Sequence, residues 1–316
     1  MRQYIVRRLL LAIPTLVGVS LLIFGIMEAL PGDVAIAILG TEASSESILS
    51  LREELGLNDA WYVRYWRWVK AMATFGDLGR SLFNTKRPIK ELIAQYFPVT
   101  LNLTIYAMII AVLVGVPLGI ISALRRDTWV DYISRVFSVI GLSVPVFWLG
   151  VMILLLFAFT WGWQPSILYI SPFDNFWGNL QQMIWPAITL GYFQVAFIAR
   201  MTRSSLLGVL FEDYVRTARA KGLSERVVVV RHTLRNAMIP VLTLGGIQFV
   251  NLLGGVVVTE RVFNLSGWGT LLANGVFMRD FPLVQTMIFI FAAIIVVANL
   301  LVDISYSWLD PRIRYQ

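Results

Sequence analysis

The segment EDYVRTARAKGLSERVVVVRHTLRNAMIP, residues 212–240, is dense in charge, whereas the chain on either side of it is almost entirely apolar. Its pattern predicts two helices joined by a sharp corner. Asp213 is suited to cap a short helix, and Gly222 to end it in the left-handed conformation that glycine adopts at little cost. Ser224 is suited to cap a second helix, which enters apolar sequence near Pro240. Such a rigid, basic segment is either a contact surface for another protein or a loop that binds anionic lipid.

The composition is that of a membrane protein. Of 316 residues, 58% are hydrophobic and 14% are charged, whereas soluble domains average about 25% charged residues. The formal net charge of +7 therefore concerns placement relative to a bilayer and requires no nucleic acid. The chain has no cysteine, which excludes disulfides and thiolate chemistry. Its single histidine, His232, suits a surface position better than a metal site or a catalytic role.

Apolar runs of about 20 residues predict six transmembrane helices. We expect the spans at residues 9–30, 99–124, 136–160, 184–207, 237–259 and 282–306. The connecting segments are 31–98, 125–135, 161–183, 208–236 and 260–281, and the ends are 1–8 and 307–316. The first run is longer than the apolar region of a signal peptide and no clear cleavage motif follows it, so we expect it to be retained as a span.

The distribution of basic residues predicts the orientation. With six spans, one side of the membrane receives both ends of the chain, residues 125–135 and residues 200–235, and these hold 16 of the 26 Lys and Arg residues. Because basic residues accumulate on the cytoplasmic side, both termini and the charged segment are expected in the cytoplasm.

The predicted external segment 31–98 is too polar to span a membrane, yet it carries helix signals. Residues 47–55 are expected to form a short helix that Gly56 ends. Asp59 is suited to cap an aromatic-rich second helix, residues 76–82 interrupt the pattern, and Pro88 is expected to start a third helix. The aromatic helix either lies in the membrane interface or docks another protein.

Several motifs, in order along the whole chain, resemble the permeases of dipeptide, oligopeptide and nickel ABC importers. The charged segment, taken from residue 200 to 240, closely resembles their cytoplasmic coupling loop. The other matching motifs are LPGD (30–33), ELGL (54–57), GDLGRSL (76–82), TERVFNLSGWGTLLANGVFMRDFPLVQ (259–285) and LVDISYSWLDPRIR (301–314). The resemblance implies an all-α integral membrane fold of the type I ABC importer permease, with six transmembrane helices, an external helical insertion between the first two, and a permease core over about residues 95–310.

The resemblance also implies a coupling helix that sits in a cleft of a separate ATPase subunit. The residues implied are Tyr214, Val215, Arg216, Thr217, Ala218, Arg219, Ala220, Lys221, Gly222 and Leu223. Thr217 and Ala218 are small enough for close packing, and the basic residues would meet acidic rims. Ala218→Arg or Gly222→Val is therefore expected to uncouple ATP hydrolysis from uptake without preventing insertion.

The family motif is altered in two places. Aligned on Gly222, its Glu-Ala-Ala falls on Arg216, Thr217 and Ala218, and the later proline is replaced by Arg235. These departures resemble the peptide branch of the family. They leave the helix–glycine–helix shape unaffected, but the general roles of the motif do not transfer to Arg216 or Arg235.

No catalytic motif is present. The sequence lacks the phosphate-binding loop G-x-x-x-x-G-K-[ST], H-E-x-x-H and G-x-S-x-G. The resemblance accordingly implies a non-catalytic subunit that binds no cofactor or metal, while two partner ABC ATPases use ATP and Mg²⁺. The other implied partners are a second homologous permease, an extracytoplasmic substrate-binding protein and membrane lipid, in a bacterial or archaeal cytoplasmic membrane.

The apolar runs inside the predicted spans (9–27, 99–124, 136–160, about 185–199, 236–259 and 282–302) contain polar residues but no charged ones. Asn102, Gln194, Gln248 and Asn251 are candidates to line a pathway, with Gln248 and Asn251 preferred. The alternative is that they form hydrogen bonds between helices. Glycines at 115–119 and at Gly245 and its neighbours are expected to permit close helix packing.

Peptides are the expected substrate, because they are the commonest in the family that the chain resembles. A nickel complex, glutathione or an oligosaccharide is the alternative within the same family. A self-sufficient channel or secondary carrier is the alternative class, and the absence of charge within the apolar runs of the spans counts against it. A membrane enzyme is a third class, and the lack of a credible set of nucleophile, base and orienting group counts against it.

Overall fold

The computed structural model describes residues 2–29, 34–40, 43–54, 56–74, 76–82, 87–166 and 168–309. The regular structure in these residues is helical, apart from one isolated bridge between Arg80 and Pro88. The chain divides into two compact units, one formed by Val99–Gly269 with the chain from Ala298 onward, and the other by Arg2–Pro98 with Thr270–Val297. The LPGD motif at 30–33 and residues 310–314 of the final motif lie outside the described residues.

Five helices in the described part of the chain are long and apolar enough to cross a membrane. They are Leu10–Ala29, Ile89–Leu124, Phe176–Leu210, Glu225–Leu252 and Phe281–Leu301. A sixth span is possible only as a pair of helices, α6 (Trp129–Ser143) and α7 (Val146–Trp161), which meet at an angle of 102°. The expectation of one continuous span at 136–160 is therefore corrected to two short helices with a sharp bend.

The bend follows from the Val144–Pro145 step. A residue before proline is disfavoured in the helical conformation, and proline has no N–H to donate to the preceding turn. Val144 is accordingly extended, with φ −78° and ψ 128°. The hydroxyl of Tyr192 donates a hydrogen bond to the Val144 carbonyl, which keeps this backbone acceptor satisfied at the break.

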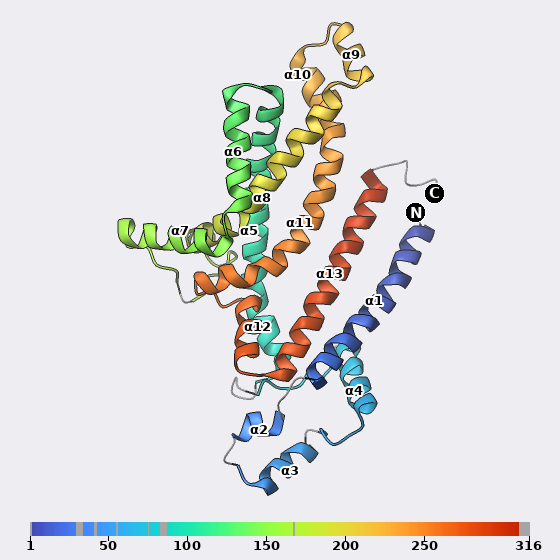
Figure 1. The fold of residues 1–316 in the computed structure, drawn as a ribbon, viewed down its shortest axis with the longest axis vertical. Coiled ribbons are helices and arrows are strands. Elements are labelled where there is room, and N and C mark those ends of the chain that lie inside the picture. The colour runs from blue at the N-terminus through green and yellow to red at the C-terminus, as the bar shows by residue number, and fades with distance from the viewer. Residues whose placement is uncertain are drawn as a thin grey trace. The chain divides into compact units, whose positions relative to one another are not determined.

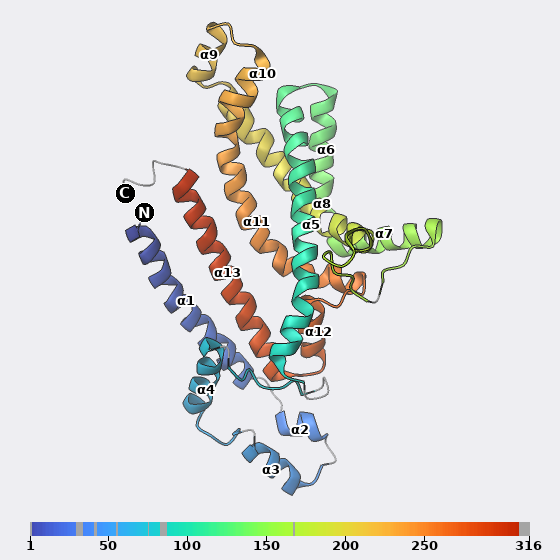
Figure 2. The same cartoon turned by 180° about the vertical axis from the view of Figure 1, so that it is seen from behind.

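In the first unit, α8 (Phe176–Leu210) is the central helix. It lies among α5 (Ile89–Leu124), α6 and α11 (Leu234–Val262) in both views (Figures 1 and 2). Two-thirds of its most apolar stretch is buried, against one-third or less for the other candidate spans. Apolar side chains of these helices, such as Leu103, Met183 and Val256, form the main core.

Glycines and alanines let the helices approach α8 closely. A Cβ on Gly119 would lie 2.5 Å from the carbonyl oxygen of Ala199, and one on Gly191 would lie 2.8 Å from that of Ala107. These distances are below any real Cβ contact, so the packing expected around Gly115–Gly119 is confirmed. At Gly245 the nearest atom is 3.8 Å away, in Met108, so close approach does not require glycine there.

The second unit contains α1 (Arg2–Ala29), the short helices α2 (Val34–Leu39) and α3 (Ser45–Glu54), α4 (Trp61–Thr74) and most of α13 (Phe281–Leu309). It also holds the first turns of α5 and most of α12 (Trp268–Phe277). Gly56 follows α3 with φ +63°, the left-handed value expected at a helix end. Leu92 donates its N–H to the Pro88 carbonyl, so α5 starts at the predicted proline.

Helix α4 divides its aromatic side chains between two faces. Tyr65 packs edge-on against Phe24 of α1, Trp68 packs edge-on against Phe289 of α13, and the Tyr65 hydroxyl bonds that of Ser20 at 2.8 Å. Trp61 and Trp66 on the other face are exposed. The interfacial and the docking interpretations of this helix both remain predictions.

Asp280 joins two of the family-like motifs within the second unit. Its carboxylate accepts hydrogen bonds from the Ser81 hydroxyl at 2.5 Å and from the Leu82 N–H at 3.0 Å. It also accepts from the Leu283 N–H at 3.3 Å and so caps α13. The GDLGRSL stretch is thereby tied to the start of the last helix through side chains that are almost completely buried.

Candidate coupling site

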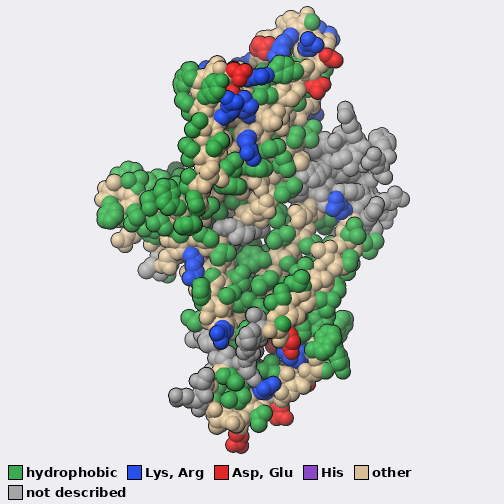
Figure 3. All heavy atoms as spheres, viewed as in Figure 1, with side chains coloured by type: hydrophobic (Ala, Val, Ile, Leu, Met, Phe, Trp, Pro, Cys, Tyr) green, Lys and Arg blue, Asp and Glu red, His purple; other side chains and the backbone are tan. Residues whose placement is uncertain are grey.

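The charged segment folds as two helices with a corner, at the ends of α8 and α11 (Figures 1 and 2). It comprises α9 (Asp213–Ala220), α10 (Glu225–Val227) and a π-helical turn, η1 (Val228–Thr233), which leads into α11. Lys and Arg side chains gather over this tip and over the nearby α5–α6 turn (Figure 3). The glycine corner is confirmed, because Gly222 has φ +77°.

The expected side-chain caps are wrong in detail. Asp213 is the first residue of α9, and the capping position belongs to Glu212, whose side chain makes no capping bond. The Asp213 carboxylate instead lies 3.6 Å from the Arg216 guanidinium. Ser224 occupies the capping position of α10, also without a side-chain bond. The corner is made by the backbone conformation at Gly222.

The inner face of α9 is fixed to its own unit. Val215 and Ala218 are buried against Val228 of η1, with Val209 of α8 beside them. The Tyr214 hydroxyl accepts a hydrogen bond of 2.8 Å from the amide of Asn236 in α11. Ala218 therefore faces its own chain, and the expectation that it packs against a partner surface is corrected.

The outer face of α9 and the corner are exposed. The exposed members of the predicted set are Tyr214, Arg216, Thr217, Arg219, Ala220, Lys221, Gly222 and Leu223. Arg219 bridges the corner to Glu225 at 2.7 Å. An exposed ion pair contributes about 1 kcal/mol or less, so this bridge orients the corner more than it stabilises the fold. The exposed face therefore carries basic side chains together with small ones such as Thr217 and Ala220.

The π-helical turn connects α9 to α11. One extra residue in the turn lets the Thr233 hydroxyl donate to the carbonyl of Val228, five residues earlier, at 3.0 Å. Such turns occur often at functional sites. His232 lies in this turn, and within the part of the chain that the structure describes no group of His, Cys, Asp and Glu is placed to hold a metal.

The four candidate pathway residues lie in different surroundings. Asn102 is buried and accepts a hydrogen bond of 3.0 Å from Asn179 of α8, as the interhelical alternative describes. Gln194 is buried on α8, and its side-chain oxygen has no partner among the described residues. Gln248 is buried and accepts a bond of 2.8 Å from Asn251, which is the exposed member of the four.

An ion pair inside the first unit was not found from sequence. Arg203 of α8 holds Asp131 of α6 with both arms of its guanidinium, at 2.7 and 2.8 Å. The Ser122 hydroxyl adds a bond of 2.6 Å, and the carboxylate is completely buried. The partners are 72 residues apart in the chain, with Asp131 in the predicted connecting segment 125–135 and Arg203 near the end of the predicted span 184–207. No local pattern relates them.

A second buried carboxylate explains the glycines of the SGWG stretch. The Thr100 hydroxyl donates to Glu260 at 2.5 Å and accepts from the Trp268 N–H at 2.7 Å. A Cβ on Gly267 would overlap the Glu260 carboxylate, and one on Gly269 would lie 3.0 Å from it. The motif TERVFNLSGWG is thus the sequence signal of this cluster, which links α5, α11 and the start of α12.

Comparison with known proteins identifies the class of this helical membrane protein. The family described as the binding-protein-dependent transport system inner membrane component matches residues 115–315, and the family of its N-terminal part matches residues 1–104. The chain belongs to this family of inner-membrane permeases of ABC importers. It is therefore a multi-pass, non-catalytic subunit without a cofactor of its own, and separate ATPase subunits use ATP.

Individual relatives agree over the whole chain. The dipeptide transport system permease protein DppB of Alkalihalophilus pseudofirmus is 44% identical over 335 residues, which cover 100% of both chains. The glutathione transport system permease protein GsiC of Escherichia coli K12 is 44% identical over 316 residues, again 100% of both.

Solved structures support the fold. An amino acid ABC transporter with histidines matches with a TM-score of 0.56 and 14% identity, over 69% of this chain and 94% of that one. The inward-facing methionine ABC transporter MetNI matches with a TM-score of 0.56 and 16% identity, over 70% and 97%. The expected all-α permease fold of an ABC importer is confirmed.

Proposed function

We propose that the chain is a permease subunit for the import of small peptides. Two relatives of equal identity carry the names of dipeptide and glutathione transport systems. Glutathione is itself a tripeptide, so a short peptide is the substrate class common to both names. A nickel complex and an oligosaccharide are the alternatives that the transport assay below distinguishes.

The subunit acts within a larger assembly. It pairs with a second homologous permease, two ABC ATPases and an extracytoplasmic binding protein, and it forms half of the pathway. The arrangement of spans and loops given above, with both termini and α9 in the cytoplasm, follows from the distribution of basic residues. On α11, Asn251 and its neighbour Gln248 are the proposed pathway residues, because Asn251 is exposed and bonds Gln248.

The residues 212–223 couple the permease to the ATPases. The observation that carries this proposal is the contrast between the two faces of α9. Its inner face is attached to α8, η1 and α11 through Val215, Ala218 and Tyr214, whereas its outer face is exposed. Because the inner contacts reach both spans, a displacement of α9 by a moving ATPase is passed to α8 and α11 as a rigid shift.

Thr217→Trp tests the coupling role. Thr217 is exposed, so tryptophan fits the isolated chain but obstructs a close contact with an ATPase. We expect substrate-stimulated ATP hydrolysis and peptide uptake by the assembled importer in proteoliposomes to fall about tenfold or more, which equals about 1.4 kcal/mol. Thr217→Ser keeps the hydroxyl that donates to the Asp213 carbonyl and is the matched control. Normal coupling in Thr217→Trp would contradict the proposal.

Competition defines the substrate class. Uptake of a labelled dipeptide by the assembled importer should be inhibited by unlabelled dipeptides or by glutathione, and not by a nickel complex or an oligosaccharide. Inhibition by a nickel complex alone would overturn the peptide proposal and leave the coupling role of α9 unaffected.

A further inference from the structure

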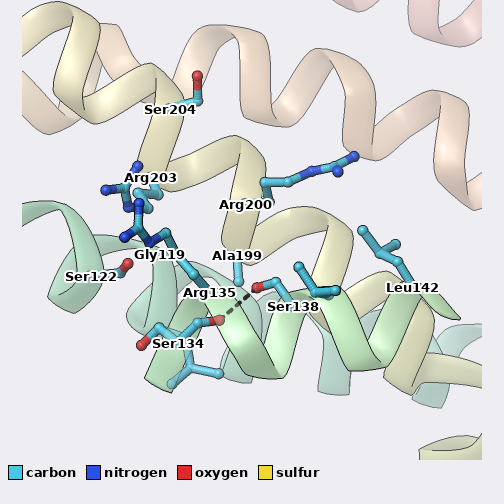
Figure 4. A pocket seen from close by; sticks show the side chains of 12 residues that line it. Gly119, Ser122, Ser134, Arg135, Ser138, Leu142, Ala199, Arg200, Arg203 and Ser204 are labelled. Atoms are coloured by element: carbon cyan, nitrogen blue, oxygen red, sulfur yellow. Dashed lines mark hydrogen bonds between the residues drawn. The ribbon is translucent and has the colours of Figure 1, made fainter. Parts of the chain in front are cut away.

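A pocket of about 330 Å³ lies within the first unit, where α5, α6 and α8 meet. Arg135 of α6 and Arg200 and Arg203 of α8 line it, together with small and apolar side chains such as Gly119, Ser138 and Leu142 (Figure 4). The guanidinium groups of Arg135 and Arg203 lie near each other, and the side chain of Arg200 extends towards Leu142 (Figure 4). The pocket is separate from α9 and contains none of the candidate pathway residues.

The charges around the pocket are not balanced. Asp131 is its neighbouring carboxylate, and both oxygens of Asp131 are already bound by Arg203, Ser122 and the Asp127 N–H. Arg135 reaches the same carboxylate only at 4.0 Å, the outer limit of an ion pair. Arg200 has no carboxylate partner among the described residues. The nearby Asp127 is paired with Arg126 at 3.0 Å. The three guanidinium groups of the pocket therefore have Asp131 as their carboxylate, which leaves an excess of two positive charges.

Besides the exposed hydroxyl of Ser204, the arginines are the donors available to a ligand. The hydroxyls of Ser134 and Ser138 donate to backbone carbonyls of the preceding turn, at 2.9 Å each. Arg135 is held in place because its guanidinium lies 4.7 Å above the centre of the Tyr132 ring. A guanidinium presents parallel N–H donors that match the oxygens of a phosphate group. Arg135 is therefore an oriented donor suited to a phosphate anion, and Arg200 adds a second guanidinium at the same pocket.

We propose that this pocket binds a phosphate group. The favoured source is the headgroup of an anionic phospholipid, and free phosphate is the other source of the same chemistry. The lipid is favoured by the surface of α6 beside the pocket. Trp129 and Tyr132 are exposed at the start of that helix, as aromatic residues are at a membrane interface. Val139 lines the pocket and is also 64% exposed, so an acyl chain can continue from the pocket along α6.

The test measures lipid bound to the full chain purified in mild detergent, by native mass spectrometry. Mixed micelles supply phosphatidylglycerol, or phosphatidylcholine for comparison. We expect R135Q/R200Q to weaken phosphatidylglycerol binding about 25-fold, because each basic side chain near an anionic lipid contributes about a factor of five. The matched control, R125Q/R126Q, removes two exposed charges from the adjacent α5–α6 turn and should bind as the native chain does.

Further variants and a second probe decide between outcomes. R135K/R200K keeps the charge and loses the forked donors, so intermediate binding is expected from a folded protein. The second probe is inorganic phosphate. If the native chain binds phosphate saturably, R135Q/R200Q does not, and no bound phosphatidylglycerol is detected, the pocket is assigned to free phosphate. The proposal is overturned if both probes bind R135Q/R200Q as tightly as the native chain, or if R125Q/R126Q loses as much binding.

Discussion

At the scale of single residues, two buried carboxylates determine how the helices of the first unit meet. Asp131 ties α6 to α8 through Arg203, and Glu260 ties the end of α11 to α5 through Thr100. A buried charge is tolerated only when it is paired and hydrogen-bonded. Each carboxylate therefore permits one arrangement of its neighbours and penalises others.

Removing the charge of Asp131 is expected to destabilise the folded chain. Asp131→Asn leaves the Arg203 guanidinium without its counterion. Because that side chain keeps 19% of its surface exposed, the cost should lie at the lower end of the roughly 3–5 kcal/mol found for broken buried pairs. Thermal unfolding in detergent, followed by tryptophan fluorescence, measures the change. Asp131→Asn combined with Arg203→Gln should recover part of the loss, and an unchanged midpoint in the single variant would contradict this account.

Gly267→Ala tests the Glu260 cluster. The added methyl group would overlap the carboxylate of Glu260, and overpacking of this kind costs about 1–3 kcal/mol. Gly208→Ala is the matched control, because no atom lies within 4 Å of the Cβ that it would add to α8. The unfolding midpoint should fall in Gly267→Ala alone. Equal midpoints for the two variants would contradict this account, because they would show that the Glu260 cluster accommodates the methyl group without loss of stability.

At the scale of elements, α9 is a short helix whose orientation is set by its neighbours. The glycine corner was predictable, because a left-handed residue after a short helix is a local signal. The inward direction of Ala218 was not, since it depends on Val228 and Val209. Ala218→Arg is consequently expected to disturb the local fold, and it no longer separates folding from coupling. The bend between α6 and α7 was missed because the apolar run at 136–160 continues through Pro145. Its length and hydropathy alone do not show that the helix breaks there.

Gly222 offers a cleaner test of the corner. A Cβ there meets no atom within 4 Å, so the cost of a substitution arises from the backbone angle φ +77° alone. Valine is penalised by about 1–2 kcal/mol or more in this conformation, whereas asparagine visits it routinely. We expect Gly222→Val to lower the uptake obtained per ATP hydrolysed and Gly222→Asn to preserve it, measured in proteoliposomes. Equal coupling ratios in the two variants would exclude a role for the corner geometry.

At the scale of the whole molecule, the helical membrane class and most of the long apolar helices were predictable, because run length and charge distribution are summed over many residues. The pairing of Asp131 with Arg203 could not be predicted from run length or charge distribution, because the contact exists only after α6 packs on α8. The pathway residues are the weakest part of the prediction for the same reason. Asn102 and Gln248 look alike in sequence, and only packing shows that one bonds another helix and the other a neighbour on its own helix.

The proposed topology can be tested with single cysteines, because the chain contains none. Phe173 is 97% exposed in the segment predicted to be external, and Thr217 is exposed on α9. An impermeant maleimide added to intact cells (or spheroplasts, where an outer membrane obstructs access) should label Phe173→Cys at once. Thr217→Cys should react only after the membrane is permeabilised. The reverse pattern would invert the orientation.

The same two variants provide the most direct measurement of the central claim, that the outer face of α9 contacts an ATPase. A photoreactive benzophenone attached to the cysteine at 217 in the assembled importer should cross-link to an ATPase subunit on illumination, with the adduct identified by mass spectrometry. The probe at 173 should give no such adduct. An ATPase adduct from 217 alone is the result predicted here. Its absence from an importer shown to contain the ATPases would contradict the coupling role of α9.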